Sequence, residues 1–294
     1  MTYDLQPLAP GFGAEISGID LGADAGGNVA GDLAGELVNV WRDAGGMLVI
    51  HDQDLTSEQH IAFSRHFGPL FGDPNEVPLQ DTVSRYIHPD FPEIYRVSNQ
   101  VDADGEPRGR KGAGTYWHSD VSFRDQPAQA SILHGKQVPR TGGDTIFANQ
   151  AAAYEALSDA MKTLLAPLHA WHDFEVAART QYAKPVVVEG DMAGANRALH
   201  PIVRTHPETG RKSLFVNPGF TSHIDGFAAD ESAAILGFLY DYCIRPEFLY
   251  RHRWREKDLV IWDNRAIMHF AVMNYTDDEP RYMERCTVIG EQPV

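Results

Sequence analysis

The sequence predicts an α+β fold in which a mostly antiparallel sheet is accompanied by a few helices. Segments with strand character occur along the whole chain and do not alternate regularly with helices, so a parallel sheet of βαβ units is not indicated. No linker-like stretch rich in proline, glycine or serine divides the 294 residues. We therefore expect a single domain that covers residues 1–294.

The individual elements follow from the spacing of apolar residues. Alternating or continuous apolar runs with turn residues at their ends predict strands at residues 12–21, 47–50, 130–135, 213–216, 259–262 and 282–289. Apolar residues at helical spacing predict helices at residues 31–44, 154–168 and 229–242. A further helix should begin after Thr56, because Thr56 and Gln59 have the spacing of a capping box.

Two polar or irregular segments separate these elements. Residues 99–115 are rich in glycine, aspartate and arginine, which is typical of a loop. The stretch at about 174–197 is broken by glycine and proline and has no clear period. Long irregular stretches within a compact domain are often lids, so we expect a lid there.

Composition and charge exclude several classes of protein. The net charge of −16 repels nucleic acid and anionic lipid, so an anionic substrate would have to be attracted by a local group of arginines. No apolar run is long enough to span a membrane, and the N-terminus does not resemble a secretory signal. The two cysteines, Cys243 and Cys286, form no disulfide framework. These features predict a cytoplasmic protein that acts on a small molecule, with no nucleic-acid or membrane partner.

A candidate metal site is spread over two segments. In a strand, residues i and i+2 project to the same side, so His118 and Asp120 could offer a nitrogen and an oxygen to one metal. This motif is weak by itself, because the chain has 13 histidines. A second segment, residues 261–269, is a strand followed by a polar turn that delivers His269. Two histidines and one carboxylate suit iron(II) that must also bind a co-substrate and dioxygen.

Two further motifs could recognise an anion. Arg281 and Arg285 follow His269, and guanidinium groups can bind a carboxylate through paired hydrogen bonds. Gly142 and Gly143 lead into a strand that begins near Thr145, whose hydroxyl is a small donor. Taken singly, each arginine could equally form a surface ion pair, and the two glycines could simply form a hairpin turn.

The order of these motifs resembles the taurine dioxygenase family (TauD/TfdA-like) of Fe(II)/2-oxoglutarate-dependent dioxygenases. The motifs are Trp-His-x-Asp, Gly-Gly-Asp-Thr, Trp-Asp-Asn-Arg with a histidine five residues after the asparagine, and Arg-x-x-x-Arg. The resemblance covers nearly the whole chain. It implies a double-stranded β-helix, or jelly-roll, with flanking helices, and a homo-oligomer that is a dimer or a tetramer.

The same resemblance implies the reaction and its site. Iron(II) would be held by His118, Asp120 and His269, with 2-oxoglutarate and O2 as co-substrates. The distal carboxylate of 2-oxoglutarate would meet Arg285 and Thr145, and Arg281 would be a less direct contact. A C–H bond of the substrate would be oxidised with release of succinate and CO2. No catalytic side chain is expected beyond the iron ligands.

The residues that match the family's substrate pocket differ from those of taurine dioxygenase. His88 matches a histidine that contacts the sulfonate, and Phe220 matches an aromatic wall. Phe91, Gly114 and Ala178 stand where a tyrosine, an asparagine and a second aromatic residue are expected. The pocket should therefore be larger and more apolar. We expect a substrate larger than taurine with an anionic group near His88 or Arg285: a sulfonate, a sulfate ester, an aryloxy acid or a modified amino acid.

Two alternatives use the same residues for other functions. A zinc-dependent hydrolase or isomerase could use the same three ligands, but would not need Thr145 and Arg285. A catalytically inactive member could act as a small-molecule binding protein, although it would then be free to lose a ligand. Binding of 2-oxoglutarate would distinguish the oxygenase from the zinc enzyme. Turnover would distinguish the oxygenase from the inactive member.

Overall fold

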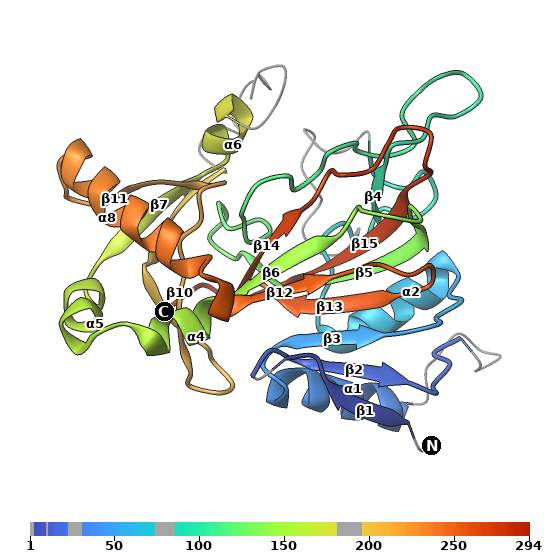
Figure 1. Cartoon of the computed structure of the whole chain (residues 1–294), viewed down its shortest axis with the longest axis horizontal. Helices are drawn as coiled ribbons and strands as arrows, with labels where there is room; N and C mark the ends of the chain where they lie inside the picture. Colours follow the sequence, from blue (N-terminus) through green and yellow to red (C-terminus); the bar gives the residue numbers. More distant parts are fainter. Residues whose placement is uncertain (1–2, 10, 23–30, 74–85, 181–195) are drawn as a thin grey trace.

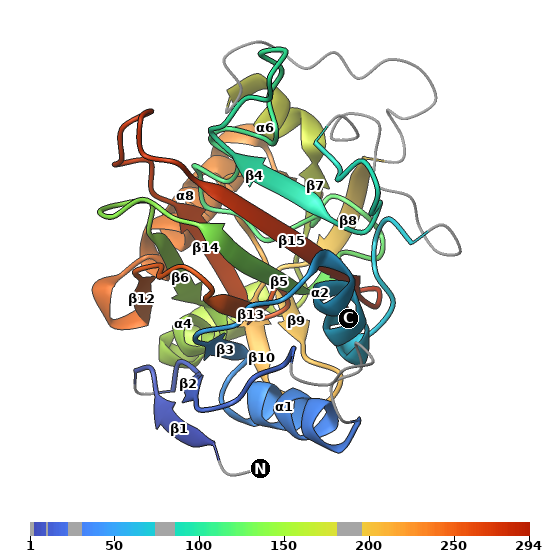
Figure 2. The same cartoon turned by 90° about the vertical axis from the view of Figure 1, so that its right-hand side faces the viewer.

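The computed structural model describes residues 3–9, 11–22, 31–73, 86–180 and 196–294 (Figure 1). Its largest unit is a seven-stranded sheet, in which β2 and β3 are parallel and every other neighbouring pair is antiparallel. Figure 2 shows the strands following one another from β4 at the top to β1 at the bottom. The order is β1 (Asp4–Pro7), β2 (Ala14–Ser17), β3 (Met47–Ile50), β13 (Leu259–Asp263), β5 (Ala128–Gln137), β15 (Tyr282–Ile289) and β4 (Tyr95–Ser98).

Two helices cover one face of this sheet. Successive side chains of a strand point to opposite faces, and the central strands are buried on both. In β3, Leu48 and Ile50 pack with Leu37 and Trp41 of α1 (Gly31–Asp43). The other covering helix is α2 (Ser57–Ser64), which begins with the predicted capping box of Thr56 and Gln59.

A smaller sheet covers the opposite face. It has the order β12 (Leu249–His252), β6 (Thr145–Asn149), β14 (Ile267–Ala271), and both pairs are antiparallel. Phe147 of β6 packs on Trp262 of β13, with ring centroids 5.5 Å apart. Met283 of β15 belongs to the same buried cluster. Functional side chains on β14 and β15 therefore face one another across this layer.

Most of the remaining elements gather at the end of the molecule away from α1 and α2 (Figure 1). Here α8 (Ala229–Cys243) contributes Leu236 and Leu239 to a second buried cluster. The other elements of the chain are β7 (His169–Asp173), β8 (Arg197–Pro201), β9 (Val203–Thr205), β10 (Lys212–Leu214), β11 (Thr221–Ile224), α4 (Gln150–Ala156), α5 (Asp159–Leu165), α6 (Phe174–Thr180), η1 (Arg65–Phe67) and η2 (Pro246–Phe248).

The structure confirms the α+β prediction and corrects several boundaries. The helix expected at 154–168 is two helices, α4 and α5. The chain is extended at Ser158, whose side chain caps α5 by accepting a hydrogen bond from Met161 N. The strand expected at 12–21 covers only β2, because Gly13 and Gly18 on either side have positive φ angles of 109° and 83°. The strand expected at 213–216 is β10, which ends at Leu214.

Three further expectations can be placed on the structure. Of the expected lid at about 174–197, residues 174–180 form α6, and residues 181–195 lie outside the described part of the chain. Both cysteines are free and buried, Cys243 on α8 and Cys286 on β15. None of the described helices combines the length and the apolar character that crossing a membrane would require.

Candidate active site

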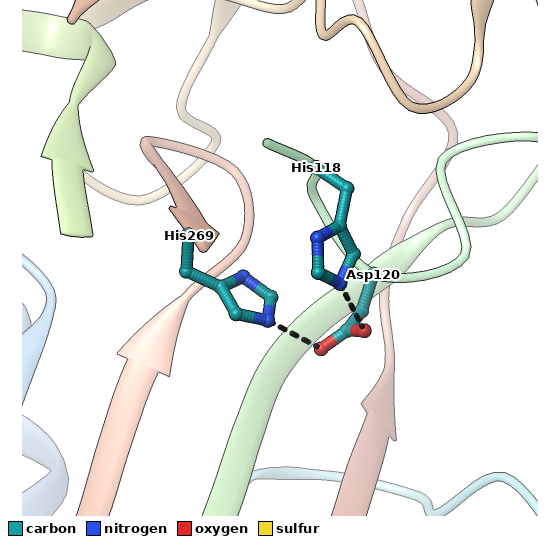
Figure 3. A group of neighbouring side chains, drawn as sticks. All are labelled: His118, Asp120 and His269. Atoms are coloured by element: carbon teal, nitrogen blue, oxygen red, sulfur yellow. Dashed lines mark ion pairs between the residues drawn. The ribbon is translucent and has the colours of Figure 1, made fainter. Parts of the chain in front are cut away.

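Three side chains converge between the two sheets to form a candidate metal site. His118, Asp120 and His269 are all buried, and one ligand atom of each lies within 4.8 Å of the others. His118 Nε2 is 3.6 Å from Asp120 Oδ1, and His269 Nε2 is 3.9 Å from Asp120 Oδ2. Figure 3 shows both rings directing a nitrogen toward the carboxylate. The predicted ligand set is thus brought together in space.

The main chain sets the spacing of the two histidines. His118 N donates to His269 O at 3.1 Å, and His269 N donates to His118 O at 2.9 Å. His269 lies on β14, but the segment with His118 and Asp120 is a loop with this single bridge, so the expected strand is wrong. The loop turns at Val121, whose φ of 56° is unusual for a β-branched residue. Asp120 therefore reaches the site by a turn in the loop.

Hydrogen bonds orient two of the ligands. His118 Nδ1 lies 2.8 Å from Tyr116 O, and a carbonyl can only accept, so this nitrogen carries the proton and Nε2 has a free lone pair. Asp120 Oδ2 accepts from Ser131 Oγ at 2.7 Å. The main-chain N–H of Asp120 donates to Asn264 Oδ1 at 3.1 Å. Hydrogen bonds therefore hold both the main-chain N–H and the carboxylate of Asp120 in place.

Asn264 connects the metal ligand to the core. Its Oδ1 also accepts from Trp262 Nε1 at 3.1 Å, and its Nδ2 donates to Ser131 Oγ at 3.0 Å. Asn264 is fully buried. It was noticed in the sequence only as part of the Trp-Asp-Asn-Arg motif, and Ser131 had no sequence signal beyond its place on a predicted strand. The roles of Asn264 and Ser131 in positioning Asp120 could be recognised only from the structure.

The charges around the site favour the protonation states that a divalent metal needs. Burial by itself would raise the pKa of Asp120, but Arg285 and the two histidines hold that pKa well below its usual range. Burial, with the neighbouring His118, lowers the pKa of His269 well below its usual value. An ionised carboxylate and neutral imidazoles are the forms that coordinate metals. The residues present therefore fit a divalent cation.

A cavity of about 130 Å³ opens beside these three residues. Most of its walls are apolar, and its aromatic residues come from loops and from α6 as well as from the sheets. Its charged side chains other than Asp120 are all arginines. The lining residues include Phe71, Tyr95, Arg110, Gly114, Tyr116, Phe123, Arg124, Thr145, Phe174, Phe220, Arg281 and Arg285.

The two arginines that follow His269 both line this cavity but have different partners. Arg285 Nη1 is 2.6 Å from Asp120 Oδ1, and its guanidinium lies over the Tyr95 ring. Arg281 is buried, and burial lowers its pKa. Among the described residues, the Arg281 side chain has no ion-pair partner, and its Nε has no hydrogen-bond partner. The guanidinium carbon of Arg281 lies 5.9 Å from the centroid of the Tyr275 ring.

Thr145 lines the same cavity at the start of β6. Its Oγ1 accepts a hydrogen bond from Trp254 Nε1 at 3.0 Å. Because an indole N–H can only donate, the hydroxyl proton of Thr145 remains available to donate in turn. Trp254 was not singled out in the sequence, and it orients this hydroxyl.

Only some of the residues expected to bind the substrate line the cavity. Gly114 and Phe220 line the cavity. Ala178 on α6 is buried beside the cavity-lining Phe174 and Phe220, but does not itself line the cavity. His88 and Phe91 pack on one another, with ring centroids 4.9 Å apart, and are not among the residues that line it.

Phe91 instead packs against the cluster under α1 and α2, and it lines a separate hollow with Glu58 and Arg65. The structure therefore does not bring His88 and Phe91 to the metal ligands. Gly114 has a further role that the sequence did not indicate, because a β-carbon there would lie 2.8 Å from His118 Cε1. A glycine at this position allows the loop to approach the metal ligand closely.

Comparison with known proteins agrees with this site. Residues 4–287 match the family model "Taurine catabolism dioxygenase TauD, TfdA family". The chain is 32% identical to alpha-ketoglutarate-dependent 2,4-dichlorophenoxyacetate dioxygenase of Cupriavidus pinatubonensis, covering 100% of both chains. It is 30% identical to alpha-ketoglutarate-dependent sulfate ester dioxygenase of Pseudomonas putida, covering 100% of this chain and 92% of the other.

A solved structure also matches over the full chain. The crystal structure of AAD-2 in complex with Mn(II) and N-oxalylglycine has a TM-score of 0.80 and 32% sequence identity, covering 100% of this chain and 99% of that one. The chain belongs to the TauD/TfdA family of alpha-ketoglutarate-dependent dioxygenases.

Proposed function

We propose that this dioxygenase uses iron(II) and 2-oxoglutarate (alpha-ketoglutarate) to oxidise a C–H bond of a small organic anion with an apolar body. The observation that carries the proposal is the buried His118, Asp120 and His269 set beside an arginine-lined apolar cavity. These three side chains would hold the iron. When bound with 2-oxoglutarate, iron(II) supplies the activation of dioxygen, with release of succinate and CO2.

We propose that the distal carboxylate of 2-oxoglutarate is bound by the arginine pair and Thr145. The surroundings of the two arginines favour Arg281 for the direct contact. Arg285 already has an anionic partner in Asp120, whereas Arg281 is a buried cation without one among the described residues. A buried charge is costly unless it is paired, so an incoming carboxylate would be bound strongly there. A hydrolytic zinc enzyme would have no use for such a group.

The remaining side chains of the cavity position the substrate and exclude water. Phe123, Phe174 and Phe220 pack on one another with centroid distances between 4.9 and 6.5 Å and form one wall. An apolar wall of this kind suits a substrate body larger and less polar than taurine. Aryloxy acids and sulfate esters, the substrates named for two relatives, are the first candidates, followed by sulfonates and modified amino acids.

From the family resemblance, we also propose that the two facing sheets form a double-stranded β-helix within a single domain. We propose further that the protein forms a homo-oligomer in the cytoplasm. The close match to a solved structure of the family supports the fold. Analytical ultracentrifugation would measure the mass in solution, and a monomer at micromolar concentration would refute the homo-oligomer.

One experiment tests the proposed function directly. Anaerobic addition of iron(II) and 2-oxoglutarate to the metal-free protein should produce a visible metal-to-ligand charge-transfer band. Asp120→Ala should lose the band because it removes a metal ligand, and Asp125→Ala provides a control on the same loop. A folded wild-type protein without the band would contradict the proposal.

A further inference from the structure

Four buried polar side chains lie beside the loop that carries His118 and Asp120, and the proposed reaction does not use them. They are Ser122, His172, Asn217 and Thr221, here called the His172 network. Each is at most 5% exposed, and none of them is among the residues that line the cavity. Polar groups buried away from water are costly unless they are hydrogen-bonded, and these four are connected to one another by hydrogen bonds.

His172 lies at the centre of the network. Its Nδ1 is 3.0 Å from Ser122 Oγ, and its Nε2 is 3.5 Å from Thr221 Oγ1. Burial, with the neighbouring His200, holds the pKa of His172 well below its usual value, so the ring is neutral. A neutral imidazole has one donor nitrogen and one acceptor nitrogen. His172 can therefore link two hydroxyl groups that come from different segments of the chain.

Ser122 connects the network to the metal-ligand loop. It lies two residues after Asp120, and Asn217 Nδ2 also donates to its Oγ, at 3.1 Å. Between Asp120 and Ser122 is Val121, with its unusual φ of 56°. A backbone conformation of this kind persists only where the surrounding structure fixes it. The hydrogen bond at the main-chain N–H of Asp120 fixes the loop before Val121, and the His172 network fixes it after Val121.

The same network holds two residues of the aromatic wall of the cavity. Asn217 Oδ1 accepts a hydrogen bond from Phe220 N at 2.9 Å. Asp173, which follows His172, donates its main-chain N–H to Phe220 O at 2.7 Å. Phe174 comes next and begins α6 at the end of β7 (Figure 1). The metal-ligand loop and the aromatic wall therefore share one set of hydrogen bonds.

We propose that His172 is a positioning residue that fixes the metal-ligand loop and the aromatic wall of the cavity relative to one another. This inference rests on the proposed function, which gives the metal and the wall their roles. His172 does not line the cavity, and it acts through Ser122 and through the main chain around Phe220. A change at the metal ligands is accordingly transmitted to the wall, and a change at the wall to Asp120.

The ring of His172 also packs in the core, stacked on Phe215 with centroids 5.3 Å apart, and two substitutions separate this packing from the hydrogen bonds. His172→Phe keeps a ring and loses the bonds to Ser122 and Thr221, whereas His172→Asn loses the ring and keeps a polar atom near the position of Nδ1. His172→Phe should weaken cobalt(II) binding to the metal-free protein about tenfold or more, because a ligand is no longer oriented. It should also change the absorption spectrum of bound cobalt(II), which responds to ligand geometry. His172→Asn should recover part of the affinity despite a lower midpoint in urea.

His134→Phe is the matched control for the loss of a buried histidine. His134 is 1% exposed, its Nε2 lies 2.8 Å from Gln53 O, and it does not line the cavity. His134→Phe should lower the midpoint in urea and leave cobalt(II) affinity within about twofold of wild type, because independent sites do not share effects. Ser122→Ala breaks the same link from the other side. The double variant of Ser122→Ala and His172→Phe should therefore bind cobalt(II) no more weakly than His172→Phe alone.

Fluorine NMR tests the transmission to the wall without any substrate. The protein is labelled with 4-fluorophenylalanine, and Phe174→Leu identifies the resonance of Phe174. Saturating zinc(II), which is diamagnetic, should shift this resonance in the wild type and leave it in place in His172→Phe. A wild-type resonance that does not respond to zinc(II) overturns the inference, and so does one that responds equally in His172→Phe.

The metal-binding measurements separate this inference from the proposed function. Unchanged cobalt(II) affinity and spectrum in both His172→Phe and Ser122→Ala overturn the inference. Weaker binding in His172→Asn than in His172→Phe also overturns it, because packing would then be what His172 provides. If iron(II) and 2-oxoglutarate give no charge-transfer band while His172→Phe impairs cobalt(II) binding, the positioning role stands and the oxygenase proposal fails. If the band forms and His172→Phe binds metal like wild type, only the inference fails.

Discussion

A β-carbon placed on Gly114 would lie 2.8 Å from Cε1 of His118, which is closer than real side-chain contacts allow. The φ angle of Gly114 is +73°, in the left-handed region that favours glycine. The loop before the metal ligands thus depends on glycine for both its conformation and its close approach.

Gly114→Ala should therefore weaken metal binding by about tenfold or more, because the added methyl displaces a ligand that must be held within a fraction of an ångström. The dissociation constant for iron(II) or cobalt(II), measured by titration, provides the check. Gly210→Ala is the matched control, since Gly210 has a similar φ of +69° and no neighbouring atom within 4 Å of an added β-carbon. Equal metal affinity in the two variants would contradict the prediction, because it would show that the close approach of Gly114 to His118 does not affect metal binding.

Asn264→Ala should weaken metal binding by about 10- to 100-fold, as is usual when a residue that orients a ligand is lost. The substitution leaves the main-chain N–H of Asp120 and the indole N–H of Trp262 without their acceptor. Asn149→Ala is the control, because Asn149 caps α4 and its loss should cost about 1 kcal/mol of stability without changing metal affinity. Unchanged metal affinity in Asn264→Ala would show that Asp120 is positioned by other contacts.

Arg281→Gln should raise the dissociation constant for 2-oxoglutarate by about 10- to 100-fold, since it removes a charge-assisted hydrogen bond in a buried site. Titration of the charge-transfer band measures this constant. Arg108→Gln should leave it unchanged. If Arg285→Gln abolishes 2-oxoglutarate binding while Arg281→Gln does not, the direct contact belongs to Arg285, as the sequence alone suggested.

Asp258 provides a pH-dependent prediction away from the metal. It lies 2.6 Å from His51 Nδ1 and 3.0 Å from His252 Nε2. Burial would raise the pKa of Asp258, but the hydrogen bonds from these histidines lower it to about 2. The main cause acting on His51 is the same bond, which raises the His51 pKa.

The depressed pKa of Asp258 contributes stability above about pH 4, and this contribution is lost as the pH falls toward 2. The raised pKa of His51 contributes stability below about pH 6.5 that is lost as the pH rises through its folded value. Asp258→Asn should therefore lower the free energy of unfolding by on the order of 2 kcal/mol between about pH 4 and 6.5, and by less outside that window.

Urea denaturation across this pH range measures the difference between wild type and Asp258→Asn. Asp54→Asn is the control, because Asp54 pairs with Lys257 at the exposed surface, where ion pairs contribute little. A difference that is the same at pH 3 and pH 5.5 would contradict the pairing of Asp258 with His51.

Sequence patterns predicted the buried strands well, because continuous or alternating apolar residues reflect burial directly. The strand expected at 282–289 coincides with β15. The strand β1 was not predicted, because all four of its residues are exposed and one is a proline. Among the described strands its only partner is β2, and nothing in its own composition distinguishes it from a loop.

The metal half of the site could be predicted because its motifs are short and local, whereas the substrate half depends on where loops turn. The main chain at His88 donates to Ile94 O and its ring packs on Phe91, and neither residue is among those that line the cavity. Arg124 has no motif of its own, and only the structure shows that the loop after Asp120 brings it to the cavity wall. The role of Asn264 depends likewise on three hydrogen bonds that no spacing reveals.

Because side chains alternate between the two faces of β15, this strand limits the insertions and deletions that the protein can tolerate. Arg281, immediately before β15, and Arg285 within it both line the cavity, while Cys286 and Val288 on the other face of the strand pack under the helices. Deleting or inserting a single residue between the two arginines would turn one of them into the apolar core. Natural variants should therefore keep the length of this strand. Differences in the molecules they oxidise should arise from insertions and replacements in the loops that carry Phe71, Gly114 and Arg124.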